Sequence, residues 1–90
     1  MSKETVLFSS EERKDRQSAA DFLRQLADRL AQGEVILRQG DQELVLHVPD
    51  QVVLELKAEE EAKRGGPKRK LEVEIEWSEG DQTSGEVSLG

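Results

Sequence analysis

The sequence predicts an α+β fold of two layers, in which one amphipathic helix packs on a four- to five-stranded antiparallel sheet. Apolar residues between positions 19 and 30 recur at the spacing of one helical face. After residue 34 they alternate with polar residues, as in strands that have one dry side. The helix is the natural cover for that dry side, so the expected order is β-α-β-β-β-β. We expect one domain over residues 1–80 and a disordered tail over residues 81–90, which are small, polar and weakly periodic.

The first two elements are a short strand at residues 5–10 and the helix. Val6 and Phe8 fall on one side of this strand. Ser18 is the expected N-cap of the helix, with Asp21 three residues later in a capping-box arrangement. Gly33 is expected to end the helix in the left-handed conformation. The apolar face of the helix comprises Ala19, Phe22, Leu23, Leu26, Ala27 and Leu30.

Four more strands are expected to follow as two hairpins. The first hairpin turns at residues 39–42, around Gly40 and Asp41, and ends before Pro49, which has no N–H to donate to a ladder. The second joins a strand from residue 52 to about 60 with a strand at residues 70–80 through a basic turn. Its apolar sides comprise Val52, Leu54, Leu56 and Ala58 on one strand and Leu71, Val73, Ile75 and Trp77 on the other.

These features resemble the amphi-Trp domain, a family of small prokaryotic proteins that are mostly uncharacterised. The resemblance rests on Phe8, the helix AADFLRQLADRLAQG at residues 19–33, the pair Val48-Pro49, the pattern VVLELKAE, and LEVEIEW ending in Trp77. It covers roughly residues 5–79. The resemblance implies the fold described above, and it brings no catalytic residue or cofactor to this chain.

The composition excludes several classes of function. The 90 residues contain no cysteine, which excludes disulfides, thiolate metal sites and a cysteine nucleophile. The single histidine, His47, excludes a site with several histidines in one chain. We expect no enzyme activity and no cofactor, because catalysis needs a base, a nucleophile and an orienting group around one pocket. The start has no signal-peptide pattern and no apolar run is long enough to span a bilayer, so we expect a cytoplasmic protein without a membrane partner.

A row of carboxylates lies on the last strand. Glu72, Glu74 and Glu76 are expected to project to one face about 7 Å apart, with Glu55 and Glu59 on the neighbouring strand. One interpretation is a surface for a cationic partner or a weak divalent-ion site. The other, which the alternation itself favours, is a solvated sheet face whose charges discourage edge-to-edge aggregation.

The basic turn at residues 63–70 is the best candidate for binding nucleic acid. Its cations are suited to phosphates. However, no aromatic residue lies nearby to stack on bases, and the chain carries a net charge of −7. Weak nucleic-acid binding is therefore the alternative function, less favoured than a mobile, soluble turn. The candidate phosphate contacts are Lys63, Arg64, Lys68, Arg69 and Lys70.

An apolar strip on the outer side of the sheet is the leading candidate site. Ile36, Val45 and Val53 are expected to project away from the helix, unless the sheet curls or long charged side chains cover them. The leading hypothesis is a non-enzymatic protein-interaction module that binds itself or another cytoplasmic protein through this face. Trp77 is expected to anchor the core, with an interface role as the alternative. The candidate partner-binding residues are Ile36, Val45, His47, Val53, Glu55, Glu72, Glu74 and Glu76.

Overall fold

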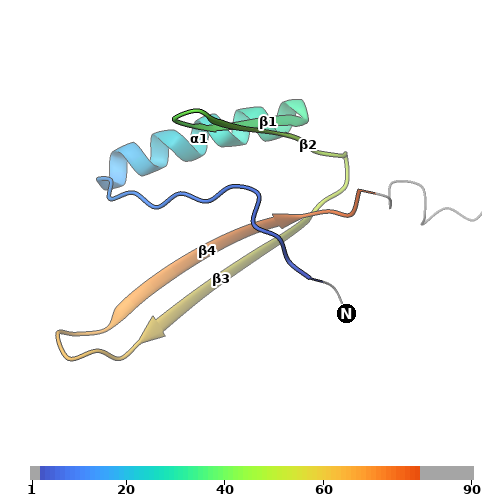
Figure 1. The fold of residues 1–90 in the computed structure, drawn as a ribbon. Helices are drawn as coiled ribbons and strands as arrows, with labels where there is room; N and C mark the ends of the chain where they lie inside the picture. The colour runs from blue at the N-terminus through green and yellow to red at the C-terminus, as the bar shows by residue number, and fades with distance from the viewer. Residues whose placement is uncertain (1–2, 80–90) are drawn as a thin grey trace, which may run out of the picture. The chain divides into compact units, whose positions relative to one another are not determined.

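The computed structural model describes residues 3–79 and shows there one helix and four antiparallel strands (Figure 1). The elements are α1 (Arg16–Gln32), β1 (Glu34–Gln39), β2 (Gln42–His47), β3 (Val53–Glu61) and β4 (Lys68–Glu76). The chain divides into two units, Met1–Val48 and Pro49–Gly90, and each is described by itself. The α+β class and the two hairpins are confirmed, while the predicted tail at residues 81–90 lies outside the described residues.

Two details of the predicted sheet are not observed. Residues 5–10 carry no strand, although the sequence predicts one there. A short alternating run forms a strand only when its backbone pairs with the edge of a sheet. Among the described residues, the one hydrogen bond to this run comes from a side chain, since the Gln42 Nε2 donates to the Leu7 carbonyl at 3.4 Å. The four described strands form two two-stranded sheets, β1–β2 and β3–β4, instead of one larger sheet.

The helix begins three residues earlier than predicted. Its N-cap is Asp15, whose carboxylate accepts a hydrogen bond from the Ser18 backbone N–H at 2.7 Å. The prediction of Ser18 as the cap is therefore wrong, because the apolar period that marks the helix starts only at Ala19 and gives no sign of the polar first turn. Asp21 accepts hydrogen bonds from Gln17 and Arg24 rather than closing a capping box.

The end of the helix and the first turn follow the sequence closely. Gly33 has φ 84° and donates its N–H to the Leu30 carbonyl at 3.0 Å, as a left-handed C-cap does. The Gly33 carbonyl in turn accepts from the Val48 N–H at 2.8 Å, so the helix end is joined to the β1–β2 ladder. Gly40 has φ 59° in a two-residue turn between Gln39 and Gln42, where a positive φ is required.

The small core of the first unit lies between α1 and β1. Val35 faces Leu46 and Leu37 faces Leu44 across the hairpin, so these four side chains share one side of it. Helix α1 packs against β1. Val35 is 6% exposed and is the one buried apolar residue among those described.

The second unit is built around one long hairpin whose two sides differ sharply. Leu54 pairs with Ile75, Leu56 with Val73 and Ala58 with Leu71, and these six side chains form what we call the apolar hairpin face. The opposite side is almost entirely charged, and we call it the polar hairpin face. It comprises Val53, Glu55, Lys57, Glu59, Glu61, Lys68, Lys70, Glu72, Glu74 and Glu76. The alternation predicted for these two strands is therefore confirmed.

Candidate interaction surfaces

The apolar hairpin face is exposed. The exposed fractions are 68% for Leu54, 69% for Leu56, 71% for Leu71 and 58% for Val73. The hairpin is a single layer, and no other helix or strand occurs among the described residues of its own unit to cover it. Patches of several hundred Å² of this kind on a soluble protein usually mark binding surfaces. This face is therefore the strongest candidate site in the part of the chain that the structure describes.

Sequence reasoning assigned this face to the core under the helix. The dimensions of the elements limit how much of the expected sheet one helix can cover. An α-helix with its side chains is about 10 Å wide, whereas strands lie about 4.8 Å apart, so one helix covers about two strands. In the first unit α1 packs on β1.

The polar hairpin face places two carboxylates directly opposite each other. Glu55 lies on the neighbouring strand, as predicted, and the register pairs it with Glu74. A hydrogen bond with Glu55 and the like charges of Glu55 and Glu76 raise the pKa of the Glu74 carboxyl. Like charges directly opposite on neighbouring strands are destabilising, so this end of the hairpin is held under repulsion at neutral pH.

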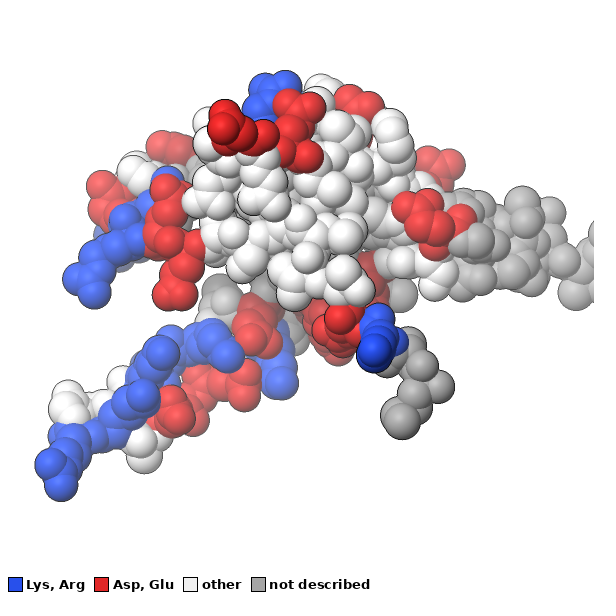
Figure 2. All heavy atoms as spheres, in the orientation of Figure 1, with Lys and Arg blue, Asp and Glu red and all other residues white. Residues whose placement is uncertain are grey.

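Lysines neutralise the other end of the polar hairpin face. Lys70 Nζ lies 3.1 Å from Glu72 and 3.8 Å from Glu59, and the Glu72 contact raises the pKa of the lysine. Lys57 Nζ also lies 3.8 Å from Glu59. Figure 2 shows basic and acidic side chains intermixed over the hairpin. The acidic row is therefore continuous in sequence but partly paired in space.

The basic turn does not gather its cations into one site. Lys63 lies 3.6 Å from Glu61 and Arg69 lies 2.8 Å from Glu60, so these charges are satisfied within the hairpin. The register puts Arg69 on the same side as the apolar hairpin face and Lys68 on the polar one. Within residues 3–79 no ion pair is formed by Lys68 or by Arg64. The arrangement is that of a solvated hairpin end with local charge balance.

The outer side of the β1–β2 hairpin has only a small apolar area. Ile36 pairs with Val45, which is 41% exposed. Polar pairs flank them on both sides: His47 Nδ1 lies 3.6 Å from Glu34, and the Arg38 Nε donates to a Glu43 carboxylate oxygen at 2.7 Å. Val53 belongs to the other unit, on the polar hairpin face. Within the first unit, the predicted outer strip contributes this one apolar pair.

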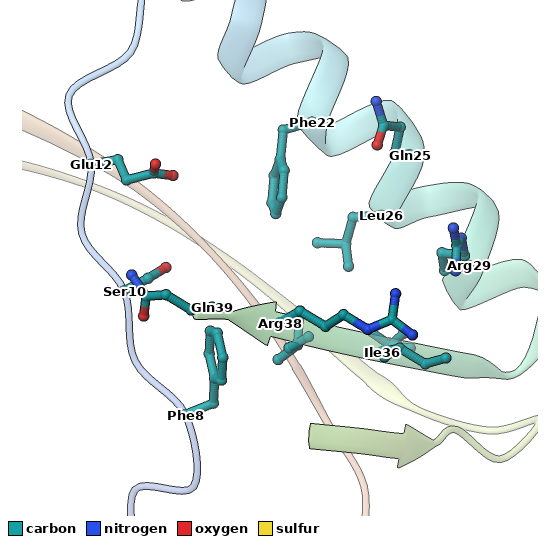
Figure 3. Close-up of a pocket in the computed structure, with 12 residues that line it drawn as sticks. Phe8, Ser10, Glu12, Phe22, Gln25, Leu26, Arg29, Ile36, Arg38 and Gln39 are labelled. Atoms are coloured by element: carbon teal, nitrogen blue, oxygen red, sulfur yellow. The ribbon is translucent and has the colours of Figure 1, made fainter. Parts of the chain in front are cut away.

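A hollow of about 360 Å³ lies in the first unit between α1, β1 and the N-terminal segment. Phe22 and Leu26 project from the helix toward β1, and Phe8 lies beside Gln39 (Figure 3). Sequence reasoning missed it, because it exists only where residues 5–10 do not pair as a strand. His47 is not among its lining residues, so the hollow brings together no histidine with Ser10.

Three further observations bear on the remaining predictions. Trp77 directly follows β4 and is half-buried. Among the described residues no group of three or more His, Cys, Asp and Glu side chains is placed to hold a metal ion. No helix in that part of the chain has the length and apolar character needed to cross a membrane.

Comparison with known proteins identifies the family. Searches against curated proteins and against solved structures found no match. The model of one family, described as the Amphi-Trp domain, matches residues 1–90. Because this match covers the whole sequence, the chain belongs to the Amphi-Trp domain family.

Proposed function

We propose that the chain is a non-enzymatic protein-interaction module that binds through the apolar hairpin face. The observation that carries the proposal is the exposure of this face, which presents Leu54, Leu56, Leu71 and Val73 to water. Burial of apolar surface contributes roughly 25 cal/mol per Å², so covering the face strongly favours association. A two-stranded hairpin is also marginally stable on its own in water, and a layer laid on its apolar side stabilises it.

The other candidate surfaces support binding less well. The outer Ile36–Val45 pair lies between two polar pairs and offers little apolar area. The polar hairpin face has repelling carboxylates at one end and paired lysines at the other. Of the cations proposed to contact phosphate, Lys63, Arg69 and Lys70 already have carboxylate partners, so nucleic-acid binding has less support.

Two finer predictions bear on this proposal. The absence of cysteine and the charged fraction of 37% fit a cytoplasmic protein. The single two-layer arrangement expected from the sequence, with both hairpins under α1, would cover the apolar hairpin face within one chain and is therefore the alternative to binding through that face. The proposal needs only that the apolar hairpin face be free to meet a partner.

The test compares one charge placed on each of two surfaces. Leu56→Asp puts a carboxylate in the middle of the apolar hairpin face, and Val45→Asp puts the same group on the outer side of β1–β2. We expect the tagged wild-type chain and Val45→Asp to capture the same proteins from a cell extract, and Leu56→Asp to lose them. Equal capture by both variants would contradict the proposal.

A further inference from the structure

We propose that the apolar hairpin face pairs with the same face of a second copy of the chain. This inference rests on the proposed function and names the partner. The resulting dimer stacks two hairpins face to face, as two sheets stack in a sandwich, with a two-fold axis between them.

Charge favours a second copy on this face. The only charged residues that the strand register places on the same side are Glu60 and Arg69, and they neutralise each other at 2.8 Å. Two such faces meet without like-charge repulsion. The chain as a whole carries a net charge of −7, and Glu55 faces Glu74 on the opposite side of the hairpin, so contact between other surfaces of two copies is disfavoured.

The sizes of the side chains also fit a two-fold arrangement. Leu56 and Val73 form the middle pair of the face. The pair on one side of them, Leu54 with Ile75, is bulky, while the pair on the other side contains Ala58. When two copies stack with their strands running in opposite directions about the middle pair, each Leu54 lies over the Ala58 of the other copy. Alternation of large and small residues across facing layers is how packed cores avoid voids.

The area sets the expected strength. The six side chains of the face and the adjoining Glu60–Arg69 pair span seven residues of each strand, so the surface to be covered is about 23 Å long and about 10 Å wide including side chains. Two such faces bury on the order of 1,000 Å² of accessible surface in total, the lower limit for a specific interface. We therefore expect a reversible dimer with a dissociation constant of order micromolar.

The first experiment measures mass against concentration for the full chain by sedimentation equilibrium, from micromolar to millimolar. Wild type and Val45→Asp should pass from monomer to dimer over this range. Leu56→Asp should stay predominantly monomeric up to tens of micromolar, with the dissociation constant raised at least about a hundredfold because an unpaired carboxylate would be buried at the interface. A wild type that remains monomeric throughout overturns the inference, as does a dimer that Leu56→Asp leaves intact.

The second experiment does not depend on a disruptive substitution. The sequence has no cysteine, so a single thiol can be placed at will. Leu56→Cys should be joined into dimers by a short bifunctional thiol reagent, because position 56 of one copy lies over the face of the other. Lys57→Cys, the next residue on the opposite side of the same strand, is the matched control and should not be joined. Equal yields from the two variants overturn the inference.

The outcomes separate this inference from the proposed function. A monomer with equal cross-linking, together with capture from an extract that Leu56→Asp abolishes, means that a different protein occupies the face. The inference then fails while the proposed function stands. A monomer whose capture is the same in Leu56→Asp and Val45→Asp contradicts both.

Discussion

The two hairpins of this chain share one sequence pattern and differ in what lies on their apolar sides. In β1–β2 the strands have six residues each, and Val35 is buried where α1 packs on β1. In β3–β4 the strands have nine residues each, the alternation is cleaner, and Leu56 is 69% exposed. Period-two alternation thus tells which side of a strand avoids water, and it does not tell what covers that side.

The largest expected effect comes from making the same substitution in both hairpins. Val35→Ala should lower the free energy of unfolding by about 2 kcal/mol, because it removes two buried methyl groups and leaves a cavity. Val73→Ala, at a position 58% exposed, should cost less than about 0.5 kcal/mol in dilute solution. Urea unfolding at low and high protein concentration measures both.

Concentration sharpens this contrast. If a second copy covers the apolar hairpin face, the cost of Val73→Ala should rise with protein concentration while that of Val35→Ala stays constant. Equal costs at low concentration would show that Val73 is already buried within one chain.

The glycines at two turns provide the next contrast. Gly33 has φ 84°, so Gly33→Ala forces an L-residue into the left-handed region and should cost roughly 1 to 2 kcal/mol. Gly65 lies in the β3–β4 loop without a positive φ, and a Cβ there meets open space, so Gly65→Ala should change stability by less than about 0.5 kcal/mol. Thermal unfolding of the two variants checks the difference. A cost at Gly65 as large as at Gly33 would contradict the assigned turn geometry.

Acid should act on the two units in opposite directions. Hydrogen bonds from Ser18 lower the pKa of the Asp15 carboxyl below its ordinary value of 3.8. The N-cap therefore stabilises α1 fully when the pH is above 3.8, and this stabilisation is lost as the pH falls through the lower pKa of the folded state. Glu55 is the main cause that raises the pKa of the Glu74 carboxyl above its ordinary value of 4.5. The hairpin is therefore most stable when the pH is below 4.5, and it loses that extra stability as the pH rises through the raised pKa of the folded state. Between neutral pH and about 4, β3–β4 should therefore gain stability while α1 changes little.

Amide hydrogen exchange resolves the two responses residue by residue. The amides of β3 and β4 should become better protected as the pH falls, after correction for the intrinsic exchange rate. Glu74→Gln should remove most of this pH dependence, because it takes away the repelling charge opposite Glu55. A hairpin whose protection falls with acid in the wild type would contradict the pairing of these carboxylates.

How much of this was predictable follows from the kind of interaction involved. The alternation over residues 53–60 and 70–76 and the left-handed Gly33 are local, and they were predicted correctly, whereas residues 68–69 belong to β4 and not to the predicted turn. The prediction of a strand at residues 5–10 was wrong, because a strand needs the edge of a neighbouring strand to pair with, and a local sequence pattern does not supply one. The Asp15 cap was missed because it precedes the apolar period on which the prediction relied.

The candidate site was harder to predict than the fold. Sequence reasoning placed the binding surface on the outer side because it treated all inward residues as covered by one helix. The position of Glu55 on the strand next to the acidic row was expected from the hairpin, whereas its pairing with Glu74 depends on the register of the two strands. The exposure of Leu54 and Leu71 depends on which element lies over them, and that is a property of packing between elements.

The smallest expected effect concerns one ion pair from each hairpin. Arg38 with Glu43 and Arg69 with Glu60 are both cross-strand pairs, at 2.7 and 2.8 Å, with arginine side chains that are largely exposed. Because exposed pairs contribute below about 1 kcal/mol, Arg38→Met and Arg69→Met should each lower the free energy of unfolding by less than that amount in dilute solution. Arg69 shares a side with the apolar hairpin face, so covering that face would desolvate its ion pair and leave Glu60 unpaired in the variant. The loss of unfolding free energy caused by Arg69→Met should then grow with protein concentration, whereas that caused by Arg38→Met should not. Chemical unfolding across a dilution series measures both. Identical behaviour of the two variants would mean that the two hairpins are covered alike.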